Sequence, residues 1–101
     1  MTTTTDSFQP AYGSGVTVAP SGTSASTTMG RGSFGIVLTN LSSTVTAYVR
    51  IGEGTQTATI ADYPVLPSTQ VSLSKGYTDD TVAYITGGSA GSLHLIPGRG
   101  L

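Results

Sequence analysis

The stretch from Thr81 to Leu101, TVAYITGGSAGSLHLIPGRGL, constrains the fold more than any other part of this chain. In Thr81–Ile85 and Leu93–Ile96, apolar or aromatic side chains occupy both sets of alternate positions, as is typical of strands covered on both faces. The glycines between them permit the positive φ angles of a reversing loop, and Pro97 has no N–H to donate to a partner strand. We therefore expect a central hairpin that ends at Pro97. Because an isolated hairpin is only marginally stable in water, the rest of the chain must supply further strands.

Further strand patterns recur at short intervals along the chain. In residues 45–51 apolar residues alternate with others, so Val49 is expected to face inward and Arg50 outward. Turn-forming groups such as Tyr63–Pro67 separate the strands, and no segment keeps an apolar period of 3.6 residues, so no helix longer than a turn or two is expected. The predicted strands are Gly15–Ala19, Ser24–Thr28, Phe34–Thr39, Val45–Ile51, Thr57–Ile60, Thr69–Ser74, Thr81–Ile85 and Leu93–Ile96.

About eight short antiparallel strands punctuated by turns predict an all-β fold. At 101 residues the chain is long enough for one domain with a single thin core. We expect residues 15–101 to form a jelly-roll-like β-sandwich, with an open-ended Greek-key barrel as the alternative. A core this thin would also benefit from oligomerisation.

Residues 1–14, MTTTTDSFQPAYGS, lack any periodicity and are expected to form an extended N-terminal arm. Phe8 and Tyr12 are its only large apolar side chains. Two interpretations remain open: the arm is a loose tail, or it lies across a neighbouring subunit and binds there through Phe8 and Tyr12. Its beginning has neither a basic segment nor an apolar one, so no signal peptide is expected.

The composition argues against several kinds of partner. Charged residues make up 9 % of the chain and the formal net charge is −1, against about 25 % charged residues in an ordinary domain. Such a surface offers no electrostatic attraction to nucleic acid or to an anionic membrane, so neither is expected as a partner. There is no cysteine for disulfides or thiolate metal ligands.

Three sequence features have the form of chemical motifs. Gly30–Gly35, GRGSFG, matches the dinucleotide fingerprint, but a β-branched strand follows it where a helix N-terminus is needed. His94, the single histidine, lies between Leu93 and Leu95 and is expected as a partly exposed side chain on a strand. Asp79–Asp80 lacks the pattern of a calcium loop and is expected in a solvated turn. We therefore expect no catalytic residue, metal or cofactor.

The chain resembles the small, charge-poor β proteins with which tailed bacteriophages decorate or cement their capsids. The similar strings are FQPAYG, VAPSGTSAS, LTN, YVRIGEG, TATIADYPVLP, TVAYIT and LHLIPGRGL, at residues 8–13, 18–26, 38–40, 48–54, 57–67, 81–86 and 93–101. The resemblance implies a structural virion protein on the capsid surface that is not an enzyme. Its partner would be the major capsid protein, whose subunits it would bridge and stabilise, and it would itself be a homo-oligomer, a dimer or trimer.

Two other functions stay open at this point. Similar composition also occurs in phage tail, fibre and head-completion proteins. A carbohydrate-binding module is the other alternative, because jelly rolls host such sites and four tyrosines offer stacking faces: Tyr48, Tyr63, Tyr77 and Tyr84.

Overall fold

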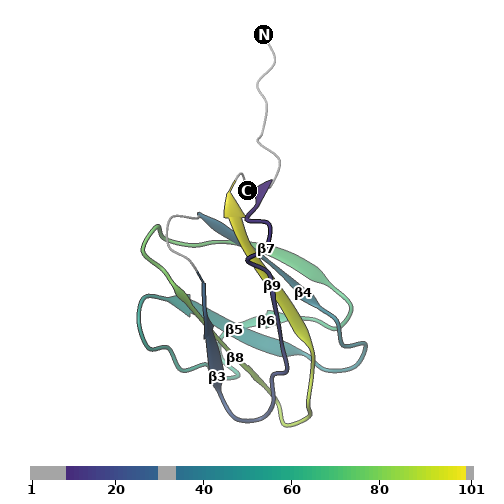
Figure 1. Ribbon diagram of the computed structural model, residues 1–101. Helices are drawn as coiled ribbons and strands as arrows, with labels where there is room; N and C mark the ends of the chain where they lie inside the picture. Colours follow the sequence, from purple (N-terminus) through teal and green to yellow (C-terminus); the bar gives the residue numbers. More distant parts are fainter. Residues whose placement is uncertain (1–8, 30–33, 100–101) are drawn as a thin grey trace.

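The computed structural model describes residues 9–29 and 34–99, and the described residues form two antiparallel sheets with no helix. One sheet has the order β1-β9-β4-β7, with β2 also paired to β9, and the other has the order β3-β8-β5-β6 (Figure 1). The described part of the chain accordingly has no helix that could span a membrane. The strands are β1 (Gln9–Pro10), β2 (Val16–Val18), β3 (Ala25–Thr28), β4 (Gly35–Asn40), β5 (Ala47–Gly52), β6 (Tyr63–Val65), β7 (Gln70–Ser74), β8 (Thr81–Thr86) and β9 (Leu93–Arg99).

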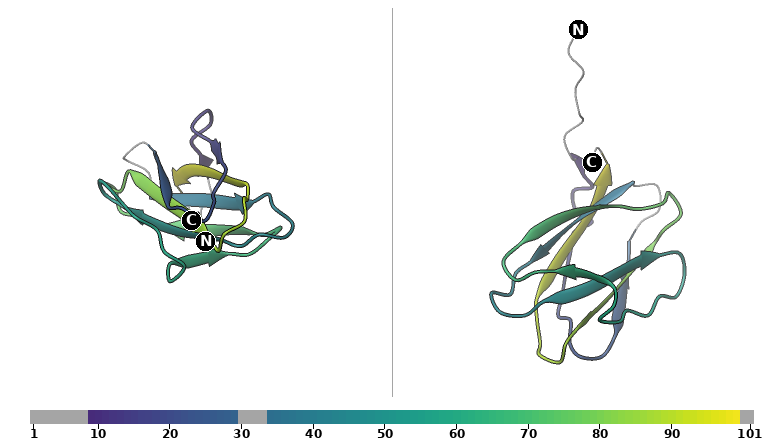
Figure 2. Two further views of the ribbon diagram at one scale, coloured as in Figure 1. Left: turned by 90° about the horizontal axis from the view of Figure 1, so that it is seen from below. Right: turned by 180° about the vertical axis from the view of Figure 1, so that it is seen from behind.

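The two sheets pack face to face as a jelly-roll-like β-sandwich, which confirms the expected fold class. From β2 onward the chain alternates between the two sheets, except that β5 and β6 follow each other in the same sheet. As a result the strands β2-β9-β4-β7 cover the strands β3-β8-β5-β6 (Figure 2). The core takes side chains from both layers. Its buried members are Ile36, Leu38, Ala47, Val49, Val65, Val82, Tyr84, Leu93 and Leu95.

The prediction of a hairpin between β8 and β9 is wrong, because these strands belong to different sheets. The β8 strand pairs with β3 and β5, and β9 pairs with β4, β1 and β2. The glycine-rich segment 87–92 therefore crosses from one sheet to the other. Both strands are largely buried, as expected. Burial of the two faces of a strand, however, does not determine which strands form hydrogen bonds with its edges.

Pro97 does not end its strand either, since β9 continues to Arg99. The carbonyl of Pro97 accepts a hydrogen bond from the N–H of Ala11 at 2.8 Å. In an antiparallel strand the N–H and C=O of one residue point to the same side, so the nitrogen of Pro97 faces the edge where the chain turns between β1 and β2. A proline is tolerated there because no β4 hydrogen bond is lost.

The strand expected at Thr57–Ile60 is also absent. The β6 strand lies instead at Tyr63–Val65, so the prediction of a turn at Tyr63–Pro67 is wrong for these three residues. The segment 53–62 crosses the outer face of the β3-β8-β5-β6 sheet, where the N–H of Ala58 donates to Oγ of Ser24 at 2.8 Å. Ala58 is 2 % exposed. The register pairs Ala83 with the outward-facing Arg50, so Ala83 lies on the outer face of the sheet, and yet it is fully buried. The alternation in 57–60 thus reflects a covering loop rather than a strand.

Candidate functional site

Tyr12 is the described half of the predicted pair of aromatic anchors, since Phe8 lies outside the described residues. Gln9–Pro10 pairs with the end of β9, and the N–H of Ser14 then donates to the carbonyl of Ala11 at 3.0 Å. This closes a turn in which Gly13 has φ +84°, a value that suits glycine at the third position of a type II turn. Tyr12 occupies the second position and is 87 % exposed. The fold thus holds an aromatic ring in solvent at the base of the N-terminal segment.

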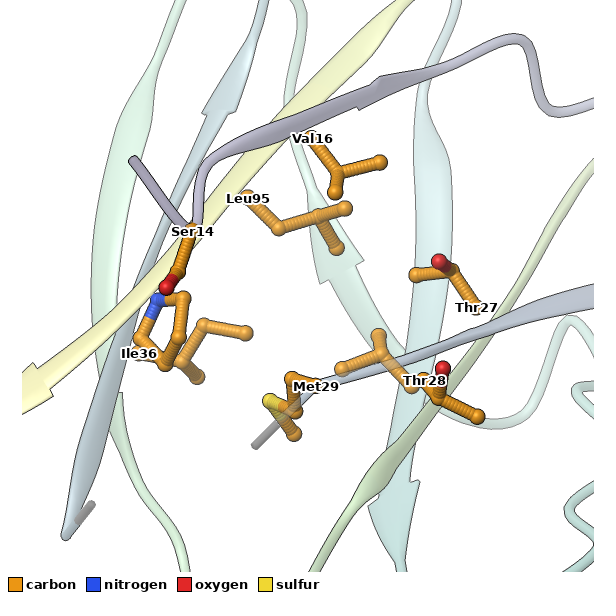
Figure 3. Close-up of a pocket in the computed structure, with 9 residues that line it drawn as sticks. Ser14, Val16, Thr27, Thr28, Met29, Ile36 and Leu95 are labelled. Carbon is orange, nitrogen blue, oxygen red and sulfur yellow. The ribbon is translucent and has the colours of Figure 1, made fainter. Parts of the chain in front are cut away.

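A narrow crevice lies beside this turn, between β2 and β9 on one side and β3 on the other. Its floor reaches the buried side chains of Ile36, Val82 and Leu95. Figure 3 shows Ser14, Val16 and Leu95 opposite Thr27, Thr28 and Met29. The free space inside is about 10 Å³, room for about one water molecule, whereas small-molecule pockets measure about 300–1,000 Å³. The crevice is therefore an opening between two sheet edges rather than a substrate pocket.

A second hollow is an open groove at the far end of the other sheet. It has a volume of about 220 Å³ and is lined by Thr44, Val45, Thr46, Tyr48, Gly87 and Ser89. Thr46 and Tyr48 are two residues apart in the alternation around β5, so they share the outer face. The lining combines the ring of Tyr48 with four hydroxyl groups, one of them on that ring, and carries no charge. Such a surface can stack on a neutral ring and exchange hydrogen bonds with hydroxyl groups.

The tyrosines named as stacking faces fall into different environments. Tyr84 is 7 % exposed in the core, and burial raises the pKa of its hydroxyl. Tyr63 and Tyr77 are 48 % and 59 % exposed, but neither lines the groove at Tyr48. The structure therefore does not bring the four rings together.

The remaining candidate residues are also dispersed. His94 is partly exposed on β9, as expected. Its ring lies against Gly15, where an added Cβ atom would be only 2.8 Å from Cε1 of His94. Gly35, the last residue of the glycine-rich motif, starts β4, so a strand and not a helix follows the motif, and residues 30–33 lie outside the described residues. Within residues 9–29 and 34–99, no three His, Cys, Asp or Glu side chains are grouped to hold a metal ion.

Asp79 and Asp80 lie in the β7–β8 loop, where they organise a buried lysine. The ammonium of Lys75 donates to the carbonyl of Asp79 at 2.7 Å, and the carboxylate of Asp79 accepts from the N–H of Gly76 at 2.7 Å. Lys75 is 6 % exposed. Burial lowers the pKa of Lys75, although Asp79 and Asp80 act to raise it.

The sequence did not indicate that Phe34, Leu41 and Leu66 are exposed at the two ends of the sandwich. Phe34 and Tyr77 lie with their ring centroids 5.4 Å apart at one end and are 56 % and 59 % exposed. Leu41 and Leu66 are 56 % and 57 % exposed at the opposite end, where the carbonyl of Ser42 accepts from the N–H of Ser68. No sequence signal separates these residues from core positions, because exposure at a strand end depends on the neighbouring loops.

The strand order places the chain among jelly-roll β-sandwiches. Among solved structures, the crystal structure of PirA is similar to it, with a TM-score of 0.53 and 13 % sequence identity. The match covers 83 % of this chain and 93 % of that chain. At this identity the likeness concerns the fold alone. No protein-family model and no curated protein matches the sequence.

Proposed function

We propose that this chain is a structural protein of a bacteriophage virion that binds the outer surface of the capsid. It stabilises the shell by bridging subunits of the major capsid protein. The observation that carries the proposal is Tyr12, an aromatic side chain 87 % exposed on a hydrogen-bonded turn at the base of the N-terminal segment. A rigid aromatic ring loses little conformational freedom on binding, and such rings dominate many protein interfaces.

The surroundings of Tyr12 support a bridging role. The chain enters the sandwich at Gln9, which pairs with Arg99 at the end of β9, so Tyr12 lies close to the point where the N-terminal segment joins the domain. The jelly-roll fold occurs in viral capsid domains as well as in lectins, so it suits the proposal without selecting it. A surface with few charges also keeps its contacts when the ionic strength changes.

The test uses capsids of the encoding virus that lack this protein. Wild-type protein, Tyr12→Ser and a variant without residues 1–8 are added, and occupancy and thermal stability of the shells are measured. Both changes should lower occupancy. Tyr12→Ser should leave the melting temperature of the free protein nearly unchanged, because Tyr12 is exposed and such substitutions alter stability by about 0.5 kcal/mol or less. Tyr63→Ser is the matched control at another exposed tyrosine. Absence of capsid binding by the wild type would overturn the proposal.

The groove at Tyr48 favours a second candidate function, binding of a neutral carbohydrate. Sugar rings stack on aromatic faces through C–H groups and present hydroxyls, which the groove could meet with Thr44, Thr46 and Ser89. Binding to a panel of neutral glycans that Tyr48→Ala abolishes and Tyr63→Ala preserves would establish this function. No binding by the wild type would exclude it for that panel.

A tail or fibre station is distinguished from a capsid station by labelling the protein on intact virions.

A further inference from the structure

The β7 strand forms an open edge of the β1-β9-β4-β7 sheet, because β4 is the only strand it pairs with among the described residues. Two hydrogen bonds flanking the strand define which way its backbone points. The N–H of Lys75 donates to the carbonyl of Phe34 at 3.0 Å, and the N–H of Asn40 donates to the carbonyl of Thr69 at 2.8 Å. Bonded and non-bonded pairs alternate in an antiparallel ladder. The N–H and C=O groups of Gln70, Ser72 and Ser74 therefore point away from β4, toward the outside of the sheet.

This edge lacks the features that block strand addition at two other edges of the molecule, those formed by β1 with β2 and by β6. The opposite edge of the same sheet is interrupted by the turn at Tyr12, and β6 is three residues long and contains Pro64. The β7 strand has five residues, QVSLS, with no proline and no charged side chain. Uninterrupted, uncharged edges of this kind are templates for pairing with another strand.

The side chains along this edge also offer apolar surface. Val71 and Leu73 pack against the core but stay partly exposed. Leu66, 57 % exposed, precedes the strand, and Tyr77, 59 % exposed, follows it beside Phe34. An additional strand would cover Val71 and Leu73, and a partner running antiparallel would bring its own Leu66 end to the Tyr77 end of the first copy.

We propose that a second copy of this chain pairs with the first along β7, antiparallel and related by a two-fold axis at Ser72. Ser72 then lies opposite Ser72 of the second copy, and Gln70 lies opposite Ser74. Each of these pairs exchanges two backbone hydrogen bonds, and the β4-containing sheets of both copies join into one. The pairing is self-complementary because only neutral side chains meet across the axis and because the exposed apolar residues occupy opposite ends of the strand. It does not depend on capsid binding.

The first test is a cysteine introduced at the axis, since the chain contains none. Opposed residues of a bonded antiparallel pair have Cα atoms about 5.5 Å apart, within the range that a disulfide spans. Ser72→Cys, oxidised with diamide, should give a covalent dimer that reducing agent dissolves. Ser26→Cys is the matched control and should give no covalent dimer, because Ser26 lies outside the proposed β7 pairing. Ser26 lies on the edge strand β3, where the bond from the N–H of Met29 to the carbonyl of Asp80 shows that Ser26 also points outward.

The second test compares molar mass in solution by light scattering. Wild type and Ser26→Pro should be dimers, whereas Ser72→Pro should be a folded monomer, because the N–H that it removes is unused within one copy. Ser72→Lys, which places two ammonium groups against each other at the axis, should also be a monomer, so the test does not rest on the proline alone. Circular dichroism verifies that each variant is folded.

Three results would overturn the proposal. One is a monomeric wild type, and another is a dimer that survives both Ser72→Pro and Ser72→Lys. The third is a dimer that is lost on deletion of residues 1–8 while Ser72→Cys fails to cross-link, which would show that the edge receives the N-terminal segment of another copy. Capsid binding by a monomeric wild type would leave the proposed function intact and refute only the β7 pairing.

Discussion

The side-chain amide of Asn40 in β4 donates to the carbonyl of Val65 in β6 at 2.9 Å and so ties one sheet of the sandwich to the other. The same nitrogen donates to the carbonyl of Val45 at 2.8 Å, and Oδ1 accepts from the N–H of Ser42 at 3.0 Å. Asn40 is 2 % exposed. One short side chain therefore satisfies three backbone groups, two in the β4–β5 loop and one in β6.

Replacing Asn40 by alanine should destabilise the domain by about 3 kcal/mol, because each buried polar group left without a partner costs about 1–3 kcal/mol. The neighbouring Thr39→Ala is the control. Thr39 lies on the outer face and loses only an exposed hydrogen bond from Gln70, so the loss should be under about 1 kcal/mol. Urea unfolding of the two variants provides the comparison. Equal losses would show that the bridge contributes nothing beyond an ordinary surface contact.

Val49→Asp should destabilise the domain by about 4 kcal/mol or more, because it buries an unpaired charge. Val49 is 2 % exposed, as the sequence predicts, and the adjacent Arg50 is outward and exposed. Arg50→Gln, the control, removes only an ion pair with Asp62 in which the arginine side chain is 47 % exposed, so the loss should be below about 1 kcal/mol. Melting temperatures by circular dichroism measure both. Similar values for the two variants would contradict the register of β5.

Asp62 should make the domain more stable at neutral than at acid pH. The N–H of Thr59 lowers the pKa of Asp62, burial acts in the opposite direction, and the Arg50 guanidinium lowers it further. A carboxyl with a lowered pKa in the folded state contributes stability above its unfolded pKa and loses it as the pH falls through the folded value.

Asp62→Asn removes this contribution. The difference in melting temperature between wild type and Asp62→Asn should therefore be largest near neutral pH and shrink in acid. A difference that stays constant, or grows as the pH falls, would contradict the assignment.

Lys75 should also make the stability of the domain rise with pH, but in the alkaline range. Because burial lowers its pKa in the folded state, the unfolded chain binds more protons between the lowered value and the ordinary one. Stability from this residue therefore rises with pH across that interval. Lys75→Met should flatten the rise relative to wild type in unfolding experiments across the alkaline range. Lys75→Arg, whose side chain stays charged across the alkaline range, should also lack the rise in stability. If the rise persists in either variant, a group other than Lys75 causes it.

The sequence by itself determined the positions of most strands and the buried face of β5. Alternation placed Val49 inward and Arg50 outward, and both positions are confirmed. The absence of a 3.6-residue period correctly predicted an all-β fold. These properties depend on the period of the backbone, which the side chains of one segment record locally.

Only the tertiary structure decided the pairing of strands and the exposure of their ends. Two-sided burial of β8 and β9 is the same whether they pair with each other or, as they do, with β3 and β5 and with β4. Pro97 continues its strand because the segment at Ala11 lies where the missing N–H points, and Ala58 is buried because its loop meets Ser24. Each outcome depends on contacts between residues far apart in the chain, and no local pattern records which distant segment will supply them.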